Sequence, residues 1–276
     1  MKSCCSVSRA FARAFNRTWL WYTIIKSLRG VTLRSAVNLF ISALFDILMS
    51  LFVNPHNPRV LFDGIYFSKK HGLLYYVRGG TDDIYYLLPN REGPVEEYIL
   101  RSLKSGDVFV DVGANVGYYT TLAAKLGAKV IAMEPEPRTV ILLRLNLCLN
   151  DLKAVLLNEC AYSVEGFQEM CIPVSGHFGI ATLYPGDKRN CRKVRIHCTT
   201  LQKVLRDYNK VKLVKIDAEG AELDILLGIS NAFDKIEGFV IEISRRPEDV
   251  TRILVNKGYR VRPAGFTTYI IAEKRR

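Results

Sequence analysis

Two short stretches of the sequence join an acid at the end of an apolar run to a turn of small residues. In the first, Val108–Gly117, Asp111 ends the run and is followed by Gly113, Asn115 and Gly117. Backbone N–H groups in such a turn, together with the start of the helix that follows, can donate hydrogen bonds to the polar groups of a ligand. This stretch predicts a binding loop for a cofactor of the nucleotide type.

The spacing of this loop argues against a nicotinamide cofactor. That fingerprint needs glycine at positions 113, 115 and 118, and the chain has Gly113, Asn115 and Tyr118. Further along, Glu134 ends the next apolar run, where a carboxylate can accept hydrogen bonds from both ribose hydroxyls of an adenosine. The loop and the acid together favour S-adenosylmethionine (SAM), and the alternative for Glu134 is an ordinary solvated acid at a strand end.

The second stretch, Leu213–Glu222, leads from an apolar run into a turn with three acids and a glycine. Asp217 and Glu219 could orient a substrate hydroxyl or take its proton, because a general base must lie within hydrogen-bond reach of the nucleophile. For Glu222 we favour a structural role, since an acid in the first turn of a helix is stabilised by the helix dipole. We therefore predict Asp217 and Glu219 as the catalytic acids.

These residues need a sheet that brings several strand ends together. Apolar runs alternate with helical patterns from residue 108 onward, which predicts an α/β fold with a doubly wound, mostly parallel sheet. Ligands bind such sheets at the carboxyl ends of the strands, where the strand order reverses. The predicted strands are Val108–Asp111, Lys129–Met133, Ala154–Asn158, Leu213–Asp217, Phe239–Ile243 and Tyr269–Ala272.

The segment before this fold is predicted to be a small antiparallel β cap. Its runs of aromatic and β-branched residues, Val60–Phe67, Leu73–Val77 and Ile84–Leu88, are separated by turn-forming residues. Two prolines within Asn54–Pro58 mark a boundary on its N-terminal side. The expected domains are therefore a helical extension (1–55) and a catalytic domain (56–276), divided into the cap (56–92) and the core (93–276).

The helical extension contains two amphipathic segments. Residues 7–26 place arginines one turn apart and aromatic residues on another face, and Ala36–Val53 is apolar except for a polar residue at every fourth position. An acid near the middle of the second segment, Asp46, disfavours a membrane span. Two interpretations stay open: peripheral membrane contact through residues 7–53, and packing on the catalytic domain.

Composition narrows the class of protein. Apolar residues make up 49% and charged residues 24%, which excludes a disordered chain. The net charge of +12 is concentrated at the N-terminus, where residues 1–60 hold eight cations and one acid. A surplus placed there does not by itself indicate nucleic-acid binding.

The seven cysteines show no spacing typical of a zinc site, so we expect no metal. We interpret them as reduced thiols in a cytoplasmic protein, free or peripheral at the inner face of the membrane. Cys191 and Cys198 flank a possible strand turn and could pair, although two ordinary thiols is the interpretation we favour.

The sequence resembles the FkbM family of SAM-dependent methyltransferases. The motifs that carry the resemblance are Asp111–Gly117, Glu134-Pro135 and Lys215–Glu222, with Arg78–Asp83 upstream, and the similar region runs from Tyr76 to Ala272. One departure is Gln202, which stands where members of the family usually have an acid.

The resemblance implies a class I Rossmann-like fold and transfer of a methyl group, commonly to a hydroxyl oxygen of a sugar, glycolipid or small metabolite. It implies that SAM contacts Asp111, Gly113, Asn115, Gly117 and Glu134, that the adenine lies near Cys160 and Ala161, and that Asp217 borders the reaction centre. Two other classes stay open: a nucleic-acid methyltransferase, and a membrane-associated binding module that keeps the fold without catalysis. The acids around Asp217 would repel a phosphate backbone, so nucleic acid is an unlikely partner.

Overall fold

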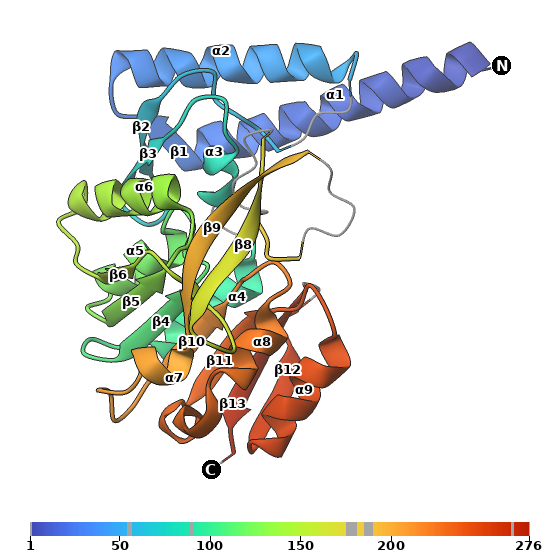
Figure 1. Cartoon of the computed structure of the whole chain (residues 1–276). Coiled ribbons are helices and arrows are strands. Elements are labelled where there is room, and N and C mark those ends of the chain that lie inside the picture. The colour runs from blue at the N-terminus through green and yellow to red at the C-terminus, as the bar shows by residue number, and fades with distance from the viewer. Residues whose placement is uncertain are drawn as a thin grey trace. The chain divides into compact units, whose positions relative to one another are not determined.

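The computed structural model divides the chain into two compact units, Met1–Arg91 and Glu92–Arg276, which are described separately (Figure 1). The structure describes residues 2–53, 57–88, 91–174, 181–184, 190–265 and 268–275, with side chains from Ala10 onward. The core unit therefore begins at Glu92, next to the expected start at residue 93. The boundary expected around 54–58 falls inside the first unit, because the N-terminal helices pack on the strands of the cap.

The described residues of the first unit form three helices and a three-stranded antiparallel sheet in the order β1-β2-β3. The helices are α1 (Lys2–Ser27), α2 (Leu33–Ser50) and α3 (Asp83–Tyr86), and the strands are β1 (Leu28–Gly30), β2 (Gly64–Ser68) and β3 (Leu73–Val77). β1, which the sequence analysis did not predict, pairs Leu28 with Ser68 of β2. Strand residues alternate between buried and half-buried, as the period of two in a one-sided sheet requires.

The prediction of a third strand in the cap, Ile84–Leu88, is wrong, because this segment begins within helix α3. The cause is local. The carboxylate of Asp83 accepts hydrogen bonds from the backbone N–H and the guanidinium of Arg78, and the Thr81 hydroxyl donates to the Arg78 carbonyl. These bonds turn the chain immediately after β3, before a further strand can form.

The second unit is an α/β fold around a seven-stranded sheet in the order β12-β13-β11-β10-β4-β5-β6. Strands β4, β5, β6, β10 and β11 are parallel, and β13 runs antiparallel to β11 and β12, which confirms the predicted fold class. The strands are β4 (Val108–Val112), β5 (Lys129–Met133), β6 (Val155–Leu157), β10 (Leu213–Ile216), β11 (Gly238–Glu242), β12 (Tyr259–Pro263) and β13 (Tyr269–Lys274). β12 was not predicted.

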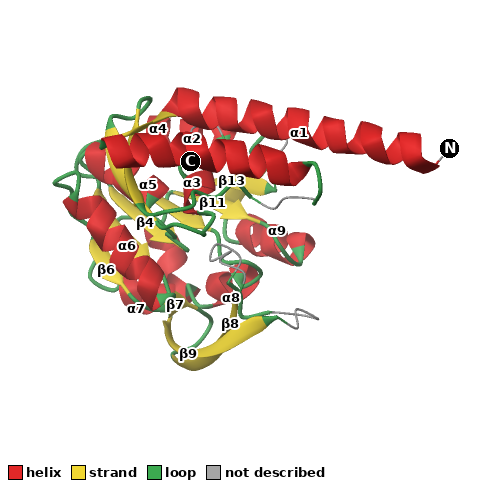
Figure 2. Cartoon of the chain, turned by 90° about the horizontal axis from the view of Figure 1, so that it is seen from above, coloured by secondary structure: helices red, strands yellow, loops and turns green. Residues whose placement is uncertain are grey.

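Helices cover this sheet, and both views place them on its two faces (Figures 1 and 2). They are α4 (Gly93–Ser102), α5 (Tyr118–Lys125), α6 (Pro137–Cys148), α7 (Leu201–Val204), α8 (Glu222–Leu227), α9 (Pro247–Asn256) and the 3₁₀ helix η2 (Ser230–Lys235). The main core lies where Phe233, Phe239 and Tyr259 pack their rings against one another. From β4 the chain proceeds to β5 on one side and later to β10 on the other, so the strand order reverses between β4 and β10.

A second, three-stranded sheet forms an arm beside the parallel strands. It contains β7 (Cys160–Ala161), β8 (Gly166–Pro173) and β9 (Cys191–Thr199) in the order β7-β9-β8. Disulfides join Cys160 to Cys198 and Cys171 to Cys191, so the expectation of reduced thiols is wrong for these four residues. Cys191 and Cys198 do not flank a turn, because they lie at opposite ends of β9 and each pairs with a different strand.

Candidate active site

The two motifs meet at the point where the strand order reverses. β4 and β10 are neighbours in the sheet, and the Asp217 N–H donates to the Val112 carbonyl. At Gly113 the backbone adopts a φ of +72°, and a Cβ there would lie 1.8 Å from the carbonyl oxygen of Asp217. Only glycine fits this approach, so Gly113 holds the loop after β4 directly against the acidic turn after β10.

Glu134 fixes the other side of the same loop. Its carboxylate accepts hydrogen bonds from the backbone N–H groups of Asn115 at 2.9 Å and Glu136 at 3.0 Å. Asn115 itself has a φ of +50°, which turns its N–H toward the acid. Burial raises the pKa of Glu134 to about 7, and this effect is larger than that of the two backbone donors, which lower the pKa. Each carboxylate oxygen can accept more than one hydrogen bond, so Glu134 keeps capacity for a ligand.

Gly117 ends the loop and begins helix α5 with a φ of +90°. A Cβ at this position would lie 2.1 Å from a methyl carbon of Leu143, so glycine is needed for packing as well as for conformation. Within α5, the Thr120 hydroxyl donates to the Asp111 carboxylate at 2.7 Å. Asp111 is 1% exposed and its carboxylate points into the protein. It therefore positions the loop and does not present a carboxylate to a ligand.

Lys215, a residue that the sequence analysis gave no role, links the two motifs electrostatically. Its buried ammonium lies 3.5 Å from an oxygen of Asp111 and 3.4 Å from one of Asp217, and 5.4 Å from the centre of the Tyr119 ring. Burial by itself would lower the pKa of Lys215, because it disfavours the charged ammonium. The nearby carboxylates of Asp217 and Asp111 have the larger combined effect and raise this pKa. The lysine is thus a buried cation that contacts an acid from each of the two motifs.

Asp217, a predicted catalytic residue, is held from two directions. It pairs with Lys215, and the Tyr269 hydroxyl donates to the same carboxylate oxygen at 2.9 Å. Burial raises the pKa of Tyr269 well above its ordinary value, so this hydroxyl remains a donor. The side chain of Asp217 is 23% exposed, which leaves part of the carboxylate accessible.

Glu242, at the end of β11, lies against Asp217 and was missed by the sequence analysis. Burial, followed by the charge of Asp217 and a hydrogen bond to it, raises the pKa of Glu242 to about 8. The Thr268 hydroxyl donates to this carboxyl group at 2.7 Å. The signal that could have found it is the one used for Glu134, an acid that directly ends a buried strand.

Glu219, the second predicted catalytic acid, occupies a turn with a φ of +49°. Its carbonyl accepts a hydrogen bond from the Thr182 hydroxyl at 2.6 Å, which ties the acidic turn to the segment 181–184 between β8 and β9. Glu222 is fully buried, and one of its carboxylate oxygens accepts from the Gly220 N–H at 2.7 Å. The structural role expected for Glu222 agrees with this contact.

Cys160 and Ala161 lie in β7, on the arm. Their segment approaches the Glu134 loop through Asn158, whose side-chain amide donates to the Glu134 and Pro135 carbonyls. The sulfur of Cys160 is bonded to Cys198, so only its backbone remains for the predicted contact with an adenine.

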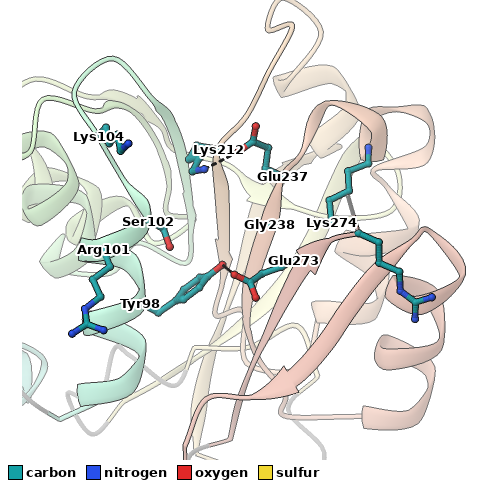
Figure 3. A pocket seen from close by; sticks show the side chains of 10 residues that line it. Tyr98, Arg101, Ser102, Lys104, Lys212, Glu237, Gly238, Glu273 and Lys274 are labelled. Atoms are coloured by element: carbon teal, nitrogen blue, oxygen red, sulfur yellow. Dashed lines mark hydrogen bonds and ion pairs between the residues drawn. The ribbon is translucent and has the colours of Figure 1, made fainter.

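A cavity of about 490 Å³ lies at the end of the sheet where the parallel strands begin, beside the start of β11 and the end of β13 (Figure 3). Tyr98 and Glu273 hydrogen-bond across it, and Lys212 pairs with Glu237. The loops after β4 and β10 are at the opposite ends of the parallel strands. This cavity is therefore separate from the candidate active site.

The fold and the site define a class of protein, an α/β protein with a doubly wound sheet and a glycine loop at the point of strand reversal. A model of the methyltransferase FkbM domain matches residues 111–261, more than half of the chain. The chain belongs to the FkbM methyltransferase family, which confirms the resemblance found in its motifs.

Named relatives agree with this assignment. Methyltransferase sdnD of Sordaria araneosa is 27% identical over 200 residues, covering 59% of this chain and 77% of that protein. The hexuronic acid methyltransferase AglP of Haloferax volcanii is 27% identical over 170 residues, covering 59% and 67%. Among solved structures, the T. thermophilus 16S rRNA N2 G1207 methyltransferase has a TM-score of 0.45 and 14% identity, over 77% of this chain and 50% of that one.

Proposed function

We propose that this enzyme transfers a methyl group from SAM to a hydroxyl oxygen of a sugar, glycolipid or other small metabolite. The observation that carries the proposal is the contact between Gly113 and the Asp217 carbonyl, which puts the cofactor loop and the acidic turn side by side. A relative whose name specifies a hexuronic acid supports a sugar-like acceptor.

The residues around the loop fit SAM. The ribose hydroxyls need an acceptor at the end of β5, which Glu134 provides, and its oxygens retain lone pairs beyond the two backbone N–H groups that they accept. The backbone of the loop between Gly113 and Gly117 lies beside Glu134, because the Asn115 N–H donates to its carboxylate. The side-chain amide of Asn158, just before Cys160 and Ala161, donates to the Glu134 carbonyl. When bound, SAM supplies an electrophilic methyl group on a sulfonium.

The protein's part of the reaction is to align the acceptor and remove its proton. Alignment contributes much of the rate enhancement, because reacting atoms that are already held in place do not pay the entropy cost of coming together. Asp217 is suited to orient the acceptor hydroxyl, since Lys215 and Tyr269 fix its carboxylate. The proton then goes to the Asp217–Glu242 pair, whose two carboxyl groups share a hydrogen bond.

The cofactor part of the proposal is tested by calorimetric titration with SAM, S-adenosylhomocysteine and NAD. We expect saturable binding of the first two ligands and none of NAD. Affinity for SAM should rise as the pH passes through about 7, because the ionised Glu134 carboxylate accepts hydrogen bonds better than the protonated group. Glu134→Gln should weaken binding and remove this pH dependence, and unchanged affinity in the variant would overturn the assignment.

The acceptor part is tested separately with isotope-labelled SAM and panels of glycans, glycolipids and small alcohols, with RNA as the comparison. Label in a base-stable methyl ether supports the proposal. Label found only in RNA would replace it with the nucleic-acid alternative.

A further inference from the structure

Helix α2 is inverted relative to an ordinary surface helix, because its polar side chains face the protein. Asn38, Ser42 and Ser50 are buried, whereas Phe40 is 60% and Leu44 is 61% exposed. Surface helices normally direct their apolar stripe to the core and their polar side to water. The polar stripe predicted in the sequence is therefore the packing face of this helix.

The buried polar groups of α2 are occupied by the rest of the first unit. Asn38 donates to the Phe62 carbonyl at 2.6 Å and accepts from the Phe62 N–H at 3.2 Å. The Ser42 hydroxyl accepts from the Leu61 N–H at 2.9 Å, and that of Ser35 accepts from the Ile65 N–H at 3.2 Å. These hydrogen bonds with the cap therefore determine that the polar face of α2 is its packed face.

Helix α1 has the same arrangement. Its inner side pairs Arg17 with Asp46 of α2, and Asp46 also accepts a hydrogen bond from the indole N–H of Trp21 at 2.7 Å. The two helices lie side by side in both views (Figures 1 and 2). Their outward side chains, here called the apolar face, are Phe11, Phe15, Trp19 and Tyr22 of α1 and Val37, Phe40, Ile41, Leu44, Phe45 and Leu48 of α2, all of them exposed.

The charge of the first unit indicates what covers this face. Residues 1–91 contain twelve lysines and arginines and four acids, a net charge of +8. The acids already have hydrogen-bond partners, since Asp46 pairs with Arg17, Asp83 with Arg78, and Asp63 and Asp82 accept from tyrosine hydroxyls. Lys26, Arg29 and Arg34 are exposed around β1, where the two helices meet. A basic rim beside an apolar face complements an anionic membrane.

We propose that α1 and α2 bind the surface of an anionic lipid bilayer, with the apolar face at the boundary between headgroups and acyl chains. Trp19 and Tyr22 pack against each other on this face, and Lys26 lies over the Tyr22 ring, a combination suited to the interface. The pair lies on the membrane and does not cross it. By length and composition alone Leu33–Ser50 could span a bilayer, but spanning would strip Asp46 and Asn38 of their partners.

The experiment is flotation of the full-length protein with vesicles of phosphatidylcholine, with and without phosphatidylserine. We expect binding that is strongest on the phosphatidylserine vesicles. Leu44→Glu/Leu48→Glu should weaken it about 100-fold or more, because two apolar side chains that enter the bilayer on binding become charged. The matched control is Ile141→Glu/Leu227→Glu, which places the same change at exposed positions of the second unit and should leave binding within about twofold.

A second variant tests the basic rim without touching the apolar face. Lys26→Gln/Arg29→Gln/Arg34→Gln should weaken binding to phosphatidylserine vesicles about 100-fold and leave phosphatidylcholine binding almost unchanged. Circular dichroism verifies that each variant is folded. Equal loss in the Ile141/Leu227 control, or no binding by the folded wild type, would overturn the proposal.

Two further readouts identify a different occupant. Protein bound to vesicles should be released by an alkaline carbonate wash, and retention would replace surface binding with a membrane span. Sedimentation without lipid should give the same oligomeric state for the wild type and Leu44→Glu/Leu48→Glu. A wild-type dimer that this variant dissociates, together with absent vesicle binding, would assign the face to a second copy of the chain.

Discussion

At the scale of single residues, the site depends on one close backbone approach. The sequence indicated Gly113, Asn115, Gly117 and Glu134 because glycine loops and strand-end acids are local patterns. It did not indicate that Gly113 faces the Asp217 carbonyl, because that contact depends on the pairing of β4 with β10. Glu242 and Tyr269 were missed for a related reason, since they reach Asp217 only through the order of the strands.

Gly113→Ala should abolish SAM binding and lower the free energy of unfolding by more than about 3 kcal/mol, because the new Cβ meets the Asp217 carbonyl at a strained φ. The control is Gly106→Ala. Gly106 has a similar φ of +86° but nothing near its Cβ, so the cost should be about 1 kcal/mol and binding should persist. Chemical denaturation and calorimetry measure both effects. Equal losses in the two variants would contradict the steric argument.

The pH dependence of turnover should depend on Glu242. Transfer of the substrate proton to Glu242 requires its ionised carboxylate, and the pKa of Glu242 is raised to about 8, so the rate at saturating substrate should rise with pH up to about that value. Glu242→Gln should lower the rate and remove the limb near pH 8. A rate profile that keeps this limb in the variant would exclude Glu242 from proton transfer.

At the scale of elements, periodicity indicated where most helices and strands lie but not which face of α2 is buried. A helical pattern with a narrow polar stripe has the same period whether the stripe faces water or the protein. The hydrogen bonds of Asn38 to residue 62 decide the direction, and they depend on contacts distant in sequence. α3 was mistaken for a strand because Ile84–Leu88 is apolar and aromatic, whereas the Arg78–Asp83 contact determines its conformation.

The inverted helix predicts a reversed response to substitution. Asn38→Leu should destabilise the first unit by about 2–4 kcal/mol, because it leaves the N–H and carbonyl of Phe62 without partners. Phe40→Asn, on the outward side, should change stability by no more than about 0.5 kcal/mol. Hydrogen exchange of the first unit measures the two effects. A stabilising Asn38→Leu would mean that the polar face is not the packed face.

At the scale of the whole molecule, charge and cysteine usage were the hardest features to interpret from sequence. The net charge alone did not identify a partner, and its concentration in residues 1–91, together with the apolar face, is the basis of the membrane proposal. The cysteine pairing was missed because it is set by the register of the arm. This register places Cys198 opposite Cys160, and it places Cys191 opposite Pro173, two residues along β8 from Cys171.

Thiol titration of the denatured protein should therefore find four more reactive groups after reduction than before it, because four cysteines are paired. Cys171→Ser/Cys191→Ser should lower the free energy of unfolding by about 3 kcal/mol, the usual effect of opening a closed loop of this length. The same titration before and after reduction in this variant should differ by two. An equal count in the reduced and unreduced wild type would show that the arm is not cross-linked.

The two disulfides also make the arm a pair of nested covalent rings. The ring closed by Cys171 and Cys191 lies within the ring closed by Cys160 and Cys198, and both closures use β9. A single peptide cut anywhere in 172–190 therefore cannot divide the molecule into two pieces. A protease could nick this segment while the protein still migrates as one band without reductant, and the fragments would separate only after the sulfur bonds are reduced.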